Sequence, residues 1–292
     1  MMNEIVFCLA QNIAYYYGQE KNNRLIWELF LSMDVLGFNY WGIKGSNYEI
    51  LNGINGTSDD FFERCSKVFG LRKEEFAADL DDIYIWEKSC MIVVDDYYLP
   101  YHPFYQKHHN NRFVVTVSRT DNLCTIYDME EINIVSSDLE KAAKGYFYIN
   151  GDIENIDHDN VNRTLLENLN NREWREFFGY IPALLKFRDE LIEKKNELKE
   201  NDMDNLYFFI NKLGGPTQTR KYTADALENL AVVLGLSEDD MLCDKIQTFK
   251  KLDKEWDILG SLFFKAARIP SNKLYERILS RLENIISLEA SL

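Results

Sequence analysis

The hydrophobic pattern of this 292-residue chain changes character near residue 150. Before that point, short runs of β-branched and aromatic residues alternate with segments of helical periodicity, and after about residue 160 only helical periodicity remains. A repeat of about two residues is typical of strands and one of about 3.6 residues is typical of helices. The segment between the halves, 151–160, is polar. We therefore predict an α+β domain over residues 1–150 and an all-α domain over 160–292.

The two halves differ in the elements that they predict. In the first half, apolar runs bounded by turn residues predict strands at 89–94, 113–117, 123–127, 132–135 and 146–149. Helical spacing in the same half predicts helices at 8–17, 22–35, 59–69 and 72–87. In the second half, an amphipathic stretch covers 173–200, and helices are expected at about 222–234, 238–268 and 271–290. Gly214-Gly215-Pro216 predicts a break between helices.

Charge and hydropathy exclude several classes of partner. The 33 Lys and Arg residues face 48 Asp and Glu residues, so the net charge is −15. A chain this acidic repels a phosphate backbone, and we expect no nucleic-acid partner. No apolar run approaches the roughly 20 residues that span a bilayer, so we expect no membrane insertion.

The cysteines and the N-terminus indicate a reducing compartment. The five cysteines are scattered, odd in number and without CxxC spacing, which argues against both a disulfide framework and a zinc site. The N-terminal segment carries an acidic residue where a signal peptide needs positive charge. We therefore expect a cytoplasmic protein. GFNYWGIKGS lacks the strand–glycine–helix context of a dinucleotide site, and we expect neither a cofactor nor a metal.

Cys8 stands at the head of the first predicted helix. It shares a mostly polar stripe with Gln11, Asn12 and Tyr15, which places it on the wetter face of that helix. The unpaired N–H groups of a first helical turn favour a thiolate over a thiol, as a nucleophilic cysteine requires. A small buried hydrophobic side chain is the other interpretation of this residue.

A thiol nucleophile needs a histidine within reach, held by a third group. If the hairpin 112–128 folds symmetrically about residue 120, position 112 stands opposite Asp128, but position 112 is Arg. Arg112 and Asp128 would form a good structural salt bridge, whereas a guanidinium is a very poor general base. The nearest histidines are His108 and His109 in the preceding loop, and each is either a candidate base or a solvated loop residue.

Several segments together resemble one family. They are CLAQNIAYYYG, LFLSMDVLGFNYWGI, VVDDYYLPYHPFYQKHHNNRFVVTV and LCTIYD in the first half, and GGPTQTRKYTADALENLAVVLG and KEWDILGSLFFKAA in the second. These segments resemble the butirosin-biosynthesis protein H family, the first group its N-terminal domain and the second its helical C-terminal domain. The resemblance implies a papain/C39-type cysteine peptidase fold that serves as an acyltransferase in natural-product biosynthesis.

The resemblance also implies roles for individual residues. It implies a Cys–His–Asp site that moves an acyl group from a carrier-protein thioester to an amine, with Cys8 as the nucleophile and Asp128 as the acid that orients the imidazole. The family's histidine stands directly before the FVV strand, where this chain has Arg112. Asn3 and Gln11 are the two candidates for binding the oxyanion.

The aromatic loop before the hairpin supplies candidate substrate contacts. Tyr98 and Tyr101 either line a substrate cleft, which would suit an aryl or amide substrate, or pack the loop against the domain.

The arginine at position 112 leaves three interpretations open. Either His109 or His108 replaces the missing histidine, or Cys8 accepts an acyl group without a fast second step, or the protein is a catalytically silent relative that binds a carrier protein or a peptide. A peptidase or amidase that uses water as the acceptor is a further alternative.

The expected partners are an acyl or peptidyl carrier protein, a small-molecule acyl acceptor and a second copy of the chain in a homodimer. Carrier proteins are usually acidic, so docking one on this chain needs a local basic surface. The segment 245–268 supplies a candidate surface with six basic residues, Lys245, Lys250, Lys251, Lys254, Lys265 and Arg268. A solvated helix face without a partner is the alternative interpretation of this segment.

Overall fold

The computed structural model describes residues 8–32, 38–40, 42–43, 51–52, 58–107, 109–153, 155–170, 180–212 and 214–292. The chain divides into two compact units, one of residues Met1–Phe30 and Ser58–Val161 and the other of Leu31–Thr57 and Asn162–Leu292. This division differs from the predicted one, which placed all of residues 1–150 in the first domain. The reason lies in aromatic packing, because Phe38 stacks on Trp256 at 5.4 Å and Tyr40 lies 5.0 Å from Phe187, centroid to centroid.

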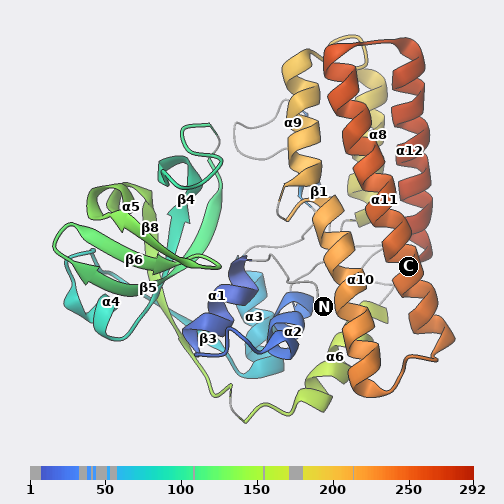
Figure 1. The fold of residues 1–292 in the computed structure, drawn as a ribbon. Coiled ribbons are helices and arrows are strands. Elements are labelled where there is room, and N and C mark those ends of the chain that lie inside the picture. Colours follow the sequence, from blue (N-terminus) through green and yellow to red (C-terminus); the bar gives the residue numbers. More distant parts are fainter. Residues whose placement is uncertain are drawn as a thin grey trace. The chain divides into compact units, whose positions relative to one another are not determined.

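The first unit is built on a six-stranded antiparallel sheet with the order β3-β8-β4-β5-β6-β7 (Figure 1). The strands are β3 (Arg72–Phe76), β4 (Met91–Asp95), β5 (Asn111–Thr120), β6 (Leu123–Tyr127), β7 (Glu131–Val135) and β8 (Ala143–Asn150). The helices with the sheet are α1 (Cys8–Tyr16), α2 (Asn23–Ser32), α3 (Ser58–Phe69), α4 (Ile83–Glu87), the 3-10 helix η1 (Asp96–Tyr98) and α5 (Ser136–Ala142). The predicted α+β class is therefore confirmed.

One predicted helix of this unit is wrong. Residues 72–87 do not form a single helix, because Arg72–Phe76 is the edge strand β3 and only Ile83–Glu87 is helical. The charged sequence RKEEF suits a helix by local propensity, but its pairing with β8, from Arg72↔Asn150 to Phe76↔Tyr146, decides its conformation.

Helix α1 packs against β5 through a small apolar face. Ala10, Ile13 and Ala14 are all fully buried. Their spacing of three and four residues keeps them on one side of the helix, as the sequence predicts. The first residue of this helix is Cys8, so the packing of α1 positions the backbone of the candidate nucleophile relative to the sheet.

The second unit is mainly helical, as predicted, and adds the short strands β1 (Asn39–Tyr40) and β2 (Leu51–Asn52), which pair with each other. Its helices are α6 (His158–Asn170), which begins in the first unit, α8 (Tyr180–Glu193), α9 (Glu200–Asn211), α10 (Pro216–Leu234), α11 (Asp240–Arg268) and α12 (Asn272–Ser291). Helix α11 packs against α9, α10 and α12 (Figure 1), with Trp256 fully buried. Within the described residues, none of these helices combines the length and the apolar character that crossing a bilayer requires.

Two breaks shape the helical unit. The predicted amphipathic stretch 173–200 lies partly outside the described residues, and its described part is interrupted between the end of α8 and the start of α9. At the predicted Gly-Gly-Pro break, Pro216 is the first residue of α10. A side chain at Gly215 would come within 2.6–2.8 Å of the carbonyl oxygens of Phe209, Ile210 and Lys212, so this turn requires glycine.

Candidate active site

Asn12 ties α1 to the part of the sheet that carries Arg112 and Asp128. Its side chain is fully buried, although the sequence placed it on the wetter face of the helix. The amide Nδ2 donates a hydrogen bond to the carbonyl of Phe113, and Oδ1 accepts one from the backbone N–H of Met129 at 3.3 Å. A buried amide needs such partners, and here they lie on the strand and on the turn next to the two candidate residues.

The structure describes the backbone of Cys8 but not its side chain. The backbone of Cys8 lies one helical turn before that of Asn12, at the N-terminal end of α1. The predicted thiol environment therefore stays a prediction, and Asn3 and His108 lie outside the described residues altogether.

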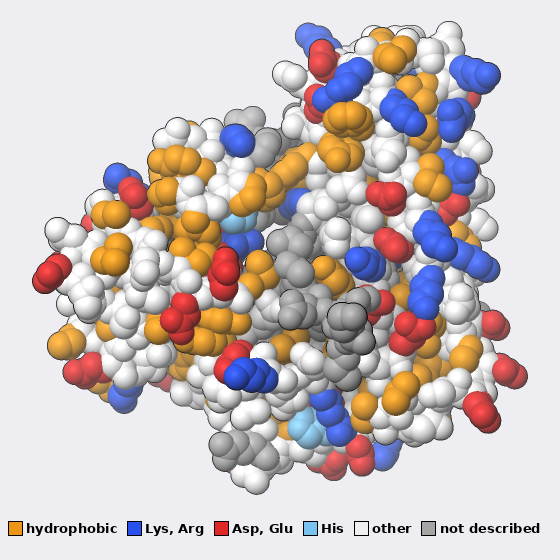
Figure 2. Space-filling view, in the orientation of Figure 1, with side chains coloured by type: hydrophobic (Ala, Val, Ile, Leu, Met, Phe, Trp, Pro, Cys, Tyr) orange, Lys and Arg blue, Asp and Glu red, His pale blue; other side chains and the backbone are white. Residues whose placement is uncertain are grey.

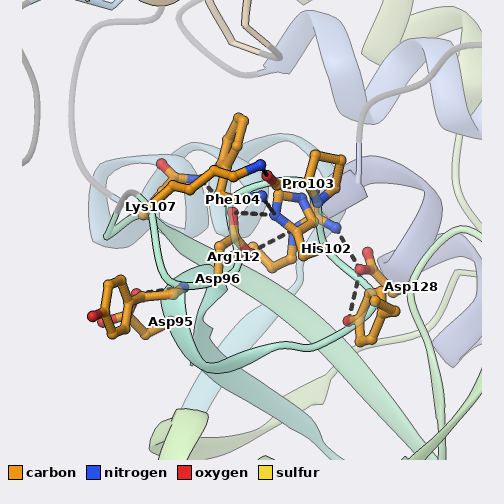
Figure 3. Close-up of polar contacts among 11 residues, drawn as sticks. Asp95, Asp96, His102, Pro103, Phe104, Lys107, Arg112 and Asp128 are labelled. Carbon is orange, nitrogen blue, oxygen red and sulfur yellow. Dashed lines mark hydrogen bonds and ion pairs between the residues drawn. The ribbon is translucent and has the colours of Figure 1, made fainter.

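Arg112 and Asp128 form a buried ion pair (Figure 3). Nη1 of Arg112 donates to Oδ2 of Asp128, and the hydroxyl of Tyr101 donates to the same oxygen at 3.0 Å. The second oxygen of this carboxylate, Oδ1, is buried without a hydrogen-bond partner among the described residues. On its other side, Nε of Arg112 lies 3.1 Å from Oδ1 of Asp96. Arg112 thus joins two carboxylates and cannot take a proton from a thiol.

The expected pair forms with a different register from the predicted one. The strands pair Val115 with Tyr127 and Thr116 with Ile126, and then shift at a bulge before Ser118. The hairpin is therefore not symmetric about residue 120, and position 112 does not stand directly opposite position 128. The long arginine side chain covers the offset, so the contact survives a register that the sequence did not reveal.

Burial changes the protonation of the groups around Arg112. Burial raises the pKa of Asp96 to about 6, although the nearby Arg112 charge and a hydrogen bond from Asn110 act in the opposite direction. Burial also raises the pKa of Tyr101, and the adjacent carboxylate of Asp128 adds to this effect. Tyr101 was a candidate for lining a substrate cleft, and the structure places its hydroxyl in this buried cluster instead.

His109 is bound to Asp95 and not to Asp128. Its Nδ1 lies 2.9 Å from Oδ2 of Asp95, and its ring stacks on Tyr97 at 4.2 Å. Burial alone would raise the pKa of Asp95, but hydrogen bonds from Lys144 and His109 lower it overall. Figure 3 shows Asp95 and Asp128 at opposite ends of the cluster. The structure thus does not bring His109 to the acid that the resemblance implies as its partner.

His102 lies in this cluster, and the sequence reasoning missed it. Its ring is buried, and Nδ1 accepts a hydrogen bond from the backbone N–H of Phe104 at 3.3 Å. The same nitrogen lies 3.6 Å from Oδ2 of Asp96. Burial and the charge of Arg112 lower the pKa of His102 to about 3. The ring is therefore neutral near pH 7, and its contact with Asp96 is not an ion pair.

A sequence signal for His102 does exist. The residue lies in LPYHPF, where Pro100 and Pro103 restrict the backbone on either side of it. A histidine held in this way has a defined position, unlike a histidine in an open loop. The two other predicted substrate-binding residues are more accessible than His102. Tyr98, in the same loop, is exposed, and Gln11, on α1, is half-buried.

The candidate basic surface on α11 is partly neutralised. Lys250 pairs with Glu228, and Arg268 pairs with Asp204. Lys245 donates to the carbonyl oxygen of Leu292, a contact that does not neutralise its charge. On the face drawn in Figure 2, basic and acidic side chains are interspersed over the helical unit. A docking surface for an acidic partner on this helix would therefore have less positive charge than its sequence suggests.

The described residues contain no group of three His, Cys, Asp or Glu side chains that could hold a metal ion. Fold and site together define an α+β protein whose antiparallel sheet carries a buried Asp–His–Arg–Asp cluster beside the helix that begins at Cys8. No protein-family model and no curated protein matches the chain.

Proposed function

We propose that the protein is a cysteine-dependent acyltransferase, or amide-forming enzyme, of natural-product biosynthesis with a papain/C39-type first domain. It would move an acyl group from a carrier-protein thioester to the amine of a small molecule through Cys8. The observation that carries this proposal is the anchoring of α1 by Asn12 to Phe113 and Met129, next to the Arg112–Asp128 pair. This anchoring holds the middle of α1, the helix that begins at Cys8, beside a buried polar cluster.

The chemistry suits such an arrangement. A thioester is already activated, so its transfer asks less of a general base than peptide hydrolysis does. The N-terminal N–H groups of α1 favour a thiolate at its first residue. Arg112 is held by Asp96 and Asp128 and adds a fixed positive charge to the cluster, while it takes no proton itself.

A catalytically silent relative that binds a carrier protein or peptide is the second candidate function. The observation that favours it is the occupation of Oδ2 of Asp128 by both Arg112 and Tyr101. In the implied arrangement this carboxylate orients a histidine, and among the described residues none is bonded to it.

Intact-mass spectrometry after mixing with an acyl thioester of N-acetylcysteamine separates the two functions. The transferase should gain one acyl mass, and Cys8→Ser should abolish the adduct. Cys243→Ser is the matched control, because Cys243 is more accessible than Cys65, Cys90 and Cys124, which are buried. Persistence of the adduct in Cys8→Ser refutes the assignment of the nucleophile. Absence of any adduct, with carrier-protein binding retained in a calorimetric titration, supports the silent relative.

A further inference from the structure

The strand β7 is an open edge of the sheet. In the described part of the chain it pairs with β6 and with no other strand, and the opposite edge of the sheet is β3. An edge strand presents backbone N–H and C=O groups with which another strand can pair. The two edges differ in charge, because β3 has the sequence RKEEF, whereas β7 has the sequence EINIV with Glu131 as its one charged residue.

The ladder between β6 and β7 fixes which backbone groups of β7 face outward. At the turn end of this ladder, the N–H of Asp128 donates to the carbonyl of Glu130. At the far end, the N–H of Ser136 donates to the carbonyl of Asn122. Bonded and non-bonded pairs alternate along an antiparallel ladder, so the even-numbered residues of β7 bond to β6. The groups that face the open edge belong to the odd-numbered residues, Glu131, Asn133 and Val135.

We propose that β7 pairs with β7 of a second copy of this chain, antiparallel and about a twofold axis at Asn133, to form a homodimer with one continuous sheet. The inference does not depend on the proposed function. In this register each Asn133 donates to and accepts from its own copy, and Glu131 faces the partner's Val135. The carbonyl of Val135, the N-cap of α5, belongs to that helix, so its N–H is the group that bonds to the partner's Glu131.

The apolar side chains of β7 fit this register. Ile134 is part of the core cluster that contains Leu139 of α5, and Ile132 packs against the same cluster. In the dimer each Ile132 stands opposite the partner's Ile134, so the apolar face of the sheet continues across the axis. On the other face, Val135 and its cross-strand neighbour Leu123 are 48% and 41% exposed. A second copy would cover part of this exposed apolar surface.

Charge favours self-pairing of β7 over self-pairing of β3. Residues that stand opposite each other in an antiparallel pair are both bonded or both non-bonded, so a twofold pair always sets one residue opposite its own copy. In β7 that residue is the neutral Asn133. In β3 a twofold pair centred on any of the first positions sets two like charges opposite each other, which is unfavourable, since these residues are Arg72, Lys73, Glu74 and Glu75.

The one charge on β7 has a neutral neighbour in this register. The carboxylate oxygen Oε1 of Glu131 accepts a hydrogen bond from the hydroxyl of Tyr15 at 3.0 Å. It therefore has a polar partner within its own chain, and the side chain opposite it in the dimer is the partner's Val135 rather than a second carboxylate.

Analytical ultracentrifugation of the full chain over a series of concentrations tests the proposal. A salt concentration of about 0.15 M screens the repulsion between two chains of net charge −15. The wild type should show a reversible monomer–dimer equilibrium. Asn133→Pro removes an N–H that faces the open edge, where a strand tolerates proline. Loss of the bonds at the axis should raise the dissociation constant at least about tenfold.

Asn133→Ser is the matched control, because it changes the same side chain and keeps the backbone N–H. Its dissociation constant should stay close to that of the wild type. A wild type that remains monomeric at every concentration overturns the proposal. So does an Asn133→Pro variant that dimerises as tightly as the wild type.

Amide hydrogen exchange in the wild type covers the case in which Asn133→Pro fails to fold. Ile132 and Ile134 bond to β6 within the monomer, so their N–H groups should exchange slowly at low and at high protein concentration. Those of Asn133 and Val135 should become protected only at the concentration at which the dimer forms. Equal exchange of these two at both concentrations overturns the proposal. Protection that appears only after an acyl carrier protein is added assigns the edge to that partner and also overturns the homodimer.

Neither measurement uses Cys8 or an acyl donor. A failure of the proposed acyl transfer therefore leaves the dimer proposal standing, and a monomeric protein leaves the acyl transfer standing.

Discussion

Asp96 and His102 should change the stability of the protein in opposite directions between pH 4 and pH 6. Burial raises the pKa of Asp96 from 3.8 to about 6, so the folded state holds this proton more tightly than the unfolded state. Its contribution to stability is then present below about pH 3.8 and is lost as the pH rises through about 6. At ~1.4 kcal/mol per pKa unit, the loss amounts to about 3 kcal/mol.

His102 acts in the opposite sense. Burial and the charge of Arg112 lower its pKa from 6.5 to about 3, so the folded state binds this proton less tightly than the unfolded state. Its contribution is present above about pH 6.5 and is lost as the pH falls through about 3, by about 5 kcal/mol in total. Between pH 4 and pH 6 the two contributions therefore nearly cancel.

Substituting Asp96 or His102 removes one of the two opposing contributions to the pH dependence of the free energy of unfolding. From pH 4 to pH 6, the free energy of unfolding of Asp96→Asn should rise by about 3 kcal/mol relative to wild type, because only the His102 contribution remains. For His102→Gln it should fall by about the same amount relative to wild type. Urea unfolding at each pH, with the slope m checked for constancy, measures both quantities. Variants whose stability follows that of wild type across this range would refute the reasoning.

Three further substitutions test the packing around the site and in the helical unit. Arg112→Met leaves the buried carboxylates of Asp96 and Asp128 without their cation and should cost about 3–5 kcal/mol in urea unfolding, whereas a cost below 1 kcal/mol would contradict the ion pairs. Asn12→Ala leaves the Phe113 carbonyl and the Met129 N–H without their partner and should lower the free energy of unfolding by about 1–3 kcal/mol. Amide hydrogen exchange in α1 should become faster, and an unchanged exchange rate would count against the anchoring role. Arg220→Met should cost about 3–5 kcal/mol, because it leaves the buried carboxylate of Glu289 without the guanidinium 2.8 Å away, and a wild-type melting temperature would contradict this.

Strands with buried side chains were predictable from sequence, and the charged edge strand was not. The run MIVVD of β4 is buried almost throughout, so its apolar character reflects its place in the sheet. RKEEF of β3 contains one apolar residue, and only its ladder with β8 makes it a strand. That ladder joins residues far apart in the chain, which a local pattern does not report.

The candidate site, like the strands, was predictable from the sequence only in part. The contact of Arg112 with Asp128 follows from the hairpin, since both residues flank predicted strands. His102 was missed because its place depends on a loop that brings it to Asp96 and Arg112, and loops have no periodicity to read. Pro100 and Pro103, which restrict the backbone on either side of His102, were the sequence feature that indicated a fixed position for it.

The packing of Phe38 and Tyr40 in the helical unit has a consequence for the order in which the two units fold during synthesis. The first unit is complete once residue 161 has emerged, whereas Phe38 requires Phe187 and Trp256, which are made much later. Domains generally acquire their structure as they leave the ribosome. On a nascent chain, Phe38 and Tyr40 would therefore lack their packing partners while the first unit folds. A fragment that ends in the polar segment 151–160 should leave both aromatic side chains exposed.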